Sequence, residues 1–443
     1  MPKLKLEQST TETYTAQAGT LLIGGYLNNY AELEELCAAL GPGGEVSNAD
    51  MLRSYVGLLA QGKSDFEAVE NVRDDKVFKL TLEIERVLSS SRMRQRFDED
   101  ARVLIEKVVV PCNTALLKNS KAPITPIYTG HVVVDGDASP YDNSNSKKEH
   151  VSRTYKGFDG YNPMKVYLGQ EGWCIAAELR PGSWNGQNEF LYVLERATGV
   201  ARALTALPLL WRLDSQHDAL ANRVWIVDEN GDFIIKVNPR KESADEWLAY
   251  AKQLGHWCTW ASPRQGKQVG HFTVYVEAEV NGKQYTFRRV FRVVERTIDK
   301  KGQRLLVPDV EVESWWTTLE LSDEEIIKLY NEHGTSEQYH SEFKTDLDLE
   351  RLPSGKFDTN DLVLNLGVLT YNILKHIGLS GLLGDDAPVR HKAKRRRIKT
   401  VIQEMINVAA RLIERGRQIW LRFSKNCASY AAFRKVYDQL AYG

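Results

Sequence analysis

The sequence lacks the features that mark several classes of protein. It has only five cysteines in 443 residues, with no CxxC pair, so we expect neither a disulfide framework nor a structural zinc site. No run of apolar residues approaches the ~20 needed to span a bilayer. The first residues, MPKLKLEQSTTETYTAQAG, lack the apolar core of a secretory signal. We therefore expect a cytoplasmic protein without a membrane partner.

Net charge is nearly absent too, because 58 Lys and Arg residues offset 59 Asp and Glu residues. The two signs are nevertheless unevenly distributed. From Arg390 to Gly443 there are 14 basic and 3 acidic residues, a net charge of +11, so the preceding part of the chain carries −12. A segregated basic tail predicts a polyanionic partner without identifying it.

Residues 1–125 are predicted to be helical, with apolar residues at steps of three and four. One of these helices, residues 92–109, begins with Arg92, Arg94 and Arg96. Short helices that include an arginine-bearing one suit DNA contact of the helix-turn-helix kind. A helical bundle with a solvated basic face explains the pattern equally well.

After Pro126 the pattern changes to α/β. Five apolar, β-branched runs are predicted strands, and two helices separate the later ones. The strands lie within residues 131–139, 164–169, 172–182, 208–215 and 232–237. This order predicts an α/β fold with a mixed five-stranded sheet.

The second half of the chain divides into an insertion, a return to the core and a tail. Residues 240–318 alternate apolar and polar positions around an Asn281-Gly282 turn, which predicts an antiparallel β insertion. Helical periodicity returns at Ser322, and residues 392–423 are predicted to form a basic helix. The predicted segments are 1–125, 126–239, 240–318, 319–380 and 381–443, and the first and last are predicted to be all-α.

Carboxylates follow two of the predicted strands. Asp135 and Asp137 end the first strand and point to one face, and Asp214 follows a later strand. Acids at the carboxyl ends of central strands lie where α/β sheets bind ligands. Without a Cys or His cluster, such acids suit Mg²⁺ or Mn²⁺ better than zinc. Strand-end aspartates also serve as caps and turn residues, and this alternative stays open.

A third group lies in the stretch YNEHGTSEQYHSEFK. Its Tyr330, His333, Glu337 and Lys344 are three, four and seven residues apart, so a helix would place them on one face. The carboxylate suits a metal site, and the other three groups can hold phosphate oxygens.

Together these motifs resemble the DDE-type transposases of bacterial insertion sequences, the cut-and-paste branch with a β-strand insertion. That family has a Y-(2)-R-(3)-E-(6)-K signature on a ribonuclease-H-like core. The finer match is to a group with Asp-x-Asp-(Ala/Ser) and Arg-x-Asp-Ser strands, here residues 135–139 and 212–215. The resemblance covers roughly residues 130–375.

The resemblance implies the roles of the acids. Asp137 or Asp135 is the first acid, with Asp137 preferred, Asp214 is the second and Glu337 is the third. Glu342 competes for the third position but lies only two residues before Lys344. His333 departs from the family, which has arginine there, and a neutral imidazole would hold phosphate less firmly.

The implied activity is excision and strand transfer of an insertion sequence. The triad would bind two Mg²⁺ ions, which Mn²⁺ can replace, and Trp315 or Trp316 would stack on a flipped base. Packing inside the protein is the other interpretation of these tryptophans. The implied partners are double-stranded DNA, as element terminal repeats and target, and a second copy of the chain in a synaptic complex. The implied location is the bacterial cytoplasm, at the nucleoid when DNA is bound.

Two alternatives share this core: an inactive transposase-derived DNA-binding protein and a metal-dependent nuclease. The basic tail is expected to contact the DNA backbone, and a solvated helix is the alternative. The tail residues expected to contact DNA are Lys394, Arg395, Arg396 and Arg397.

Overall fold

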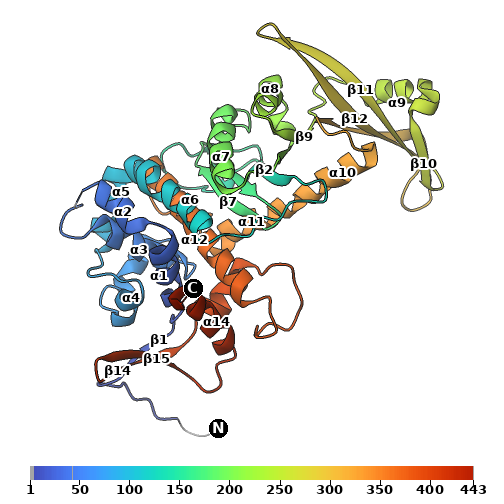
Figure 1. Ribbon diagram of the computed structural model, residues 1–443. Coiled ribbons are helices and arrows are strands. Elements are labelled where there is room, and N and C mark those ends of the chain that lie inside the picture. The colour runs from blue at the N-terminus through green and yellow to red at the C-terminus, as the bar shows by residue number, and fades with distance from the viewer. Residues whose placement is uncertain (1–3, 42, 443) are drawn as a thin grey trace.

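The computed structural model describes residues 4–41 and 43–442, and the side chains of all of these except 335 and 336. The protein is a mixed α/β structure in which helices surround one large sheet (Figure 1). Two small three-stranded sheets complete the described strands.

The large sheet has nine strands in the order β10-β11-β12-β13-β9-β8-β2-β6-β7. Its last five strands are those predicted for the core, and β2, β8 and β9 among them are mutually parallel. The other two are antiparallel to their neighbours. The five strands are β2 (Val132–Ala138), β6 (Met164–Leu168), β7 (Trp173–Glu178), β8 (Leu209–Leu213) and β9 (Asp232–Lys236).

The predicted insertion extends this same sheet. Residues Trp315–Thr317 at the end of β13 pair with Ile234–Lys236 of β9, so the sheet is continuous from the core into the insertion. Figure 1 shows β11 and β12 projecting from the molecule at the end away from α1–α5. The added strands are β10 (Thr259–Arg264), β11 (Lys267–Val280), β12 (Lys283–Ile298) and β13 (Arg304–Thr317).

The predicted turn of the insertion is present, but the insertion also contains a helix that was not predicted. Asn281 and Gly282 form the β11–β12 turn with φ of +51° and +78°, a left-handed conformation that Asn and Gly tolerate. Helix α9 (Ala244–Gln253), which packs against β12 and β13, is not predicted from the sequence. The insertion is therefore β-rich without being all-β.

The predicted helices of the amino-terminal half are present. Ser89 caps α5 by accepting a hydrogen bond from the backbone of Arg92. The helices before and within the core are α1 (Thr20–Tyr30), α2 (Leu33–Ala39), α3 (Asn48–Leu59), α4 (Lys76–Thr81), α5 (Ser90–Leu104), α6 (Val110–Asn119), α7 (Phe190–Leu204) and α8 (Leu220–Asp228).

Helix α12 (Phe357–Gly381) lies at the centre of the helical half. It is the one helix of the described chain that is long and apolar enough to cross a membrane, a feature the sequence analysis missed. However, 89% of its most apolar 18-residue window is buried inside the protein. It packs against α3, α5 and β7, so it joins the helical half to the sheet as a core helix.

The prediction that both termini are all-α is wrong. Of the basic helix predicted for residues 392–423, the helical part consists of α13 (Ile398–Val401) and a π-helical turn (Ile402–Ile406). Strands β14 (Ala410–Arg415) and β15 (Gln418–Phe423) follow, and β1 (Thr13–Thr15) pairs with β14. Gly416 and Arg417 make the hairpin turn at φ of +55° and +67°. Helix α14 (Tyr430–Tyr442) completes the chain as the structure describes it.

Candidate active site

The first two acids meet at the carboxyl edge of adjacent parallel strands. The β2–β8 pairing ends with Gly136 opposite Leu213. Asp137 is the next residue of β2, and Asp214 follows β8 directly. Because neighbouring strands lie ~5 Å apart, this register makes the two aspartates neighbours. Asp214 also accepts a hydrogen bond from the backbone of Gln216, which starts a short 3-10 turn (Ser215–His217).

The third acid comes from the segment after β13. Helix α10 (Asp323–Asn331) begins with the predicted capping box of Ser322 and Glu325. A 3-10 turn (Glu332–Thr335), α11 (Ser336–Ser341) and a π-helical turn (Glu342–Asp346) replace the single helix that the sequence predicts. Glu337 lies in α11 and is exposed.

One cavity of about 530 Å³ brings the three acids together. Its lining includes four cationic or imidazole side chains besides the carboxylates. The lining residues are Asp137, Ala138, Ser139, Tyr155, Lys156, Asp214, His333, Gly334, Glu337, His340, Ser341, Lys344 and Thr345. Asp135 and Glu342, the competing acids, do not line it.

Asp135 is instead buried in an ion pair. Arg212 donates to both of its carboxylate oxygens at 2.7 Å, and His333 Nδ1 lies 3.1 Å from Oδ1. Burial alone would raise the pKa of Asp135, but Arg212 and His333 outweigh it and hold the pKa at about 2. Asp135 therefore stays ionised beneath the cavity, and its oxygens are already engaged.

Asp137 and Asp214 remain open to the cavity, with side chains 23% and 30% exposed. Burial, followed by the charge of Asp137, raises the pKa of Asp214 to about 6. His340 Nε2 lies 3.2 Å from Asp137 Oδ2. Burial lowers the pKa of His340 to about 4, so the imidazole is neutral at pH 7.

The donor set suits a hard divalent cation. Carboxylate oxygens are the ligands that Mg²⁺ and Mn²⁺ prefer, and a cation would relieve the repulsion that raises the pKa of Asp214. Over the described residues, however, no three acidic, His or Cys side chains are close enough to form a ready-made metal site. Cation binding would therefore have to draw the carboxylates together.

Glu342 is excluded from this donor set by its own contacts. Its side chain is 1% exposed and pairs with Arg395 at 2.7 Å. It also accepts a hydrogen bond from the backbone of Ile398. Among the two candidates for the third acid, Glu337 alone faces the cavity.

Comparison with known proteins identifies the family of the chain. A family model described as "Transposase DDE domain group 1" matches residues 12–442. The chain belongs to this family. No curated protein matches it. Among solved structures, it is similar to a piggyBac transposase in a synaptic complex with hairpin DNA, at 10% identity and a TM-score of 0.42. The match covers 98% of this chain and 87% of that one.

In this DDE transposase, three of the four residues that correspond to the Y-(2)-R-(3)-E-(6)-K signature line the cavity. His333, Glu337 and Lys344 line it, and Lys344 Nζ donates to the Pro140 carbonyl at 2.6 Å. Tyr330 packs instead between Trp315 and His333, at ring-centroid distances of 5.8 and 6.1 Å. His333 pairs with Asp135, which raises its pKa despite burial.

The tryptophans predicted to stack on DNA are packed inside the DDE transposase. Trp315 is 1% exposed and belongs to the core beneath α10. Trp316 is 7% exposed, donates to Asp218 at 3.0 Å and has Arg223 over its ring at 4.1 Å. Neither ring has a free face for a base, so the packing interpretation describes both.

All three amino-terminal arginines also have partners within the protein. Arg94 pairs with Glu67 at 2.7 Å, and Arg96, 5% exposed, donates to the Val46 carbonyl at 2.6 Å. Arg92 is exposed and hydrogen-bonds to Gln95. Arg96 is therefore buried away from any DNA face, whereas contact of Arg92 and Arg94 with DNA stays a prediction.

The arginines of the basic tail secure it to the segment that follows α11. Arg395 pairs with Glu342, and Arg397 pairs with Asp346 at 2.8 Å. Arg396 donates to the Leu382 carbonyl at 2.8 Å. Of the four predicted tail contacts to DNA, only Lys394 is exposed without an internal partner in the described structure. Arg395 and Arg397 are thus paired with buried acids and Arg396 with a backbone carbonyl, and DNA contact by these arginines stays a prediction.

Four titratable residues at or beside the cavity are not predicted from the sequence. His340 is one helical turn beyond Glu337, so the same-face argument could have found it. His217 lies 3.6 Å from Asp214 and is buried, which lowers its pKa to about 3. Tyr155 and Lys156 come from the loop between β4 (Ser152–Arg153) and β5 (Asp159–Tyr161), and no sequence pattern marks them.

Proposed function

We propose that this chain is an active transposase that excises an insertion sequence and joins it to target DNA by two-metal phosphoryl transfer. The observation that carries the proposal is the shared cavity of Asp137, Asp214 and Glu337, which come from three distant parts of the chain. The five core strands in the order β7-β6-β2-β8-β9 support a ribonuclease-H-like core.

The three carboxylates would hold two Mg²⁺ ions, which can activate a water or a DNA 3′-hydroxyl and stabilise the leaving oxygen. Side chains around the carboxylates would bind the phosphate oxygens of DNA and orient the metal ligands. Lys156 and Lys344 at the cavity offer positive charge for phosphate oxygens. His340 orients the Asp137 carboxylate, and the buried Asp135–Arg212 pair fixes β2 against β8.

DNA would enter as the terminal repeats of the element and as target, with two chains in one synaptic complex. We place this activity in the bacterial cytoplasm, at the nucleoid when DNA is bound. His333 would make a modified phosphate contact, since its pairing with Asp135 raises the pKa of the imidazole and so favours its charged form.

The test is cleavage of DNA that carries the element's own ends, with Mg²⁺ and with EDTA. We expect cleavage and a joined product from the wild type, and neither from Asp137→Asn, Asp214→Asn or Glu337→Gln. Glu342→Gln is the matched control at the competing acid. Strand cleavage without a joined product would identify a nuclease, and DNA binding without cleavage would identify an inactive derivative.

A further inference from the structure

The carboxyl-terminal unit forms a groove that lies outside the proposed cleavage site. In the sheet order β1-β14-β15, strand β15 is an edge strand, and no other strand of the described residues pairs with its outer side. A cavity of about 480 Å³ follows this edge towards α14. Consecutive residues 420–425 line it, which shows that it runs along the strand edge rather than over one face. Cys427 and Tyr430 close its far side.

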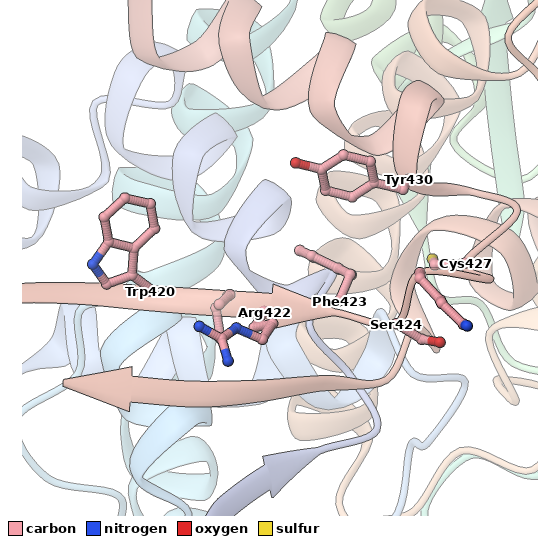
Figure 2. Close-up of a pocket in the computed structure, with 8 residues that line it drawn as sticks. Trp420, Arg422, Phe423, Ser424, Cys427 and Tyr430 are labelled. Carbon is pink, nitrogen blue, oxygen red and sulfur yellow. The ribbon is translucent and has the colours of Figure 1, made fainter. Parts of the chain in front are cut away.

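Two solvent-exposed aromatic side chains lie along this edge. Trp420 is 55% exposed and Tyr430 is 44% exposed. Figure 2 shows both rings on the open-edge side of β15, with Phe423 between them along the strand. Phe423 contacts the Tyr430 ring at a centroid distance of 5.4 Å. Two large rings thus flank the groove without being packed into the core.

The groove is also rich in uncompensated positive charge. Arg422 and Lys425 line it and are exposed, and neither has an acidic partner among residues 4–41 and 43–442. The contrast with nearby arginines is clear, since Arg411 pairs with Glu12 at 2.6 Å and Arg434 with Asp438 at 2.7 Å.

The groove continues into a second cavity with an apolar floor. This cavity, of about 620 Å³, shares Trp420, Leu421, Phe423 and Tyr430 with the first. Its other lining residues come from α1, α4, β15 and α14. Together the two cavities form one groove with aromatic and apolar side chains, bordered by Arg422 and Lys425.

We propose that this groove binds a single-stranded stretch of DNA. Phosphates would lie on Arg422 and Lys425, and an unpaired base would stack on Trp420 or Tyr430. Cations that follow the backbone, beside aromatic rings that take bases, are the two elements of single-strand recognition. Duplex DNA offers the phosphates but keeps its bases stacked on one another, so it cannot use the rings. That the nucleic acid is DNA rests on the proposed function.

The experiment measures binding of three labelled probes by fluorescence anisotropy in EDTA, so that cleavage plays no part. The probes are a single-stranded 20-mer of thymidines, the same length of abasic strand, and a 20-base-pair duplex. We expect the thymidine strand to bind at least 10-fold more tightly than the abasic strand. Trp420→Ala should weaken it roughly 10- to 100-fold, and Arg422→Gln should lower the salt slope by about 0.7.

Matched controls lie on the insertion, where Trp257 is 73% exposed and Arg304 is exposed. Trp257→Ala and Arg304→Gln should leave binding to the thymidine strand unchanged. Because Trp420 is half-exposed, we expect its variant to melt within a few degrees of the wild type, and circular dichroism checks this. Equal affinity for the abasic and thymidine strands, or an unaffected Trp420→Ala variant that is folded, would overturn the proposal. Loss of cleavage in the triad variants leaves this result untouched.

Discussion

Replacing Arg212 with methionine tests whether the buried pair beneath the cavity holds the core strands together. The change keeps most of the side-chain volume but removes the charge and both 2.7 Å hydrogen bonds to Asp135. It also removes the hydrogen bond from Arg212 to the Leu329 carbonyl at 2.9 Å. Asp135, 3% exposed, would then be an ionised carboxylate with only His333 beside it.

Two related quantities indicate the size of the expected loss. Removing one partner of a buried ion pair costs ~3–5 kcal/mol, and the remaining His333 contact favours the lower end of that range. The pKa of Asp135, lowered from 3.8 to about 2, corresponds to about 2 kcal/mol of stabilisation. Because this pKa is depressed, the contribution is present above about pH 4 and lost as the pH falls towards 2.

Urea unfolding at pH 7, followed by circular dichroism, measures this loss. Arg212→Met should unfold at a clearly lower urea concentration than the wild type, and the difference should shrink below about pH 4. The double variant Asp135→Asn/Arg212→Met should recover part of the stability, because it leaves no buried charge unpaired. A single variant within 1 kcal/mol of the wild type would refute the assignment of Asp135 to a structural pair.

Four further outcomes concern the candidate site. His340→Gln should lower strand cleavage roughly 10- to 100-fold with little change in melting temperature, because it removes the contact that orients Asp137. Since the pKa of Asp214 is raised to about 6, Mg²⁺-dependent cleavage should fall as the pH drops from 7.5 to 5, whereas a flat pH profile would contradict the raised pKa. Glu337→Gln should abolish cleavage at an unchanged melting temperature. Glu342→Gln should keep cleavage but melt lower, because its buried contacts to Arg395 weaken.

The acids could be found from the sequence because their placement depends on local patterns. Alternation along β2 puts Asp135 and Asp137 on one face, and strand ends put Asp137 and Asp214 at one edge. Spacing on a helix then brings Glu337 to the same side, even though the helix is interrupted by 3-10 and π turns. What local pattern could not decide was which aspartate is free, because that depends on Arg212, 77 residues away.

The basic residues were harder to place for the same reason. A run of arginines indicates exposed charge only if no acid faces it, and Arg395 and Arg397 meet Glu342 and Asp346 more than 50 residues earlier. The tail hairpin was missed because its apolar positions also fit helical periodicity. Tertiary pairing with β1 and the Gly416 turn favoured strands instead.

Because the insertion and the core share one sheet, the projecting arm is rigidly connected to the candidate active site. Trp316 of β13 pairs with Ile235 of β9, which pairs in turn with Leu213 of β8, the residue before Asp214. A single row of paired residues therefore runs from the base of the projecting arm to Leu213, the neighbour of the second acid. A neighbouring chain or a DNA molecule that binds the arm and displaces it would also displace β9. This strand is adjacent to β8, which ends just before the carboxylate that we expect to hold metal.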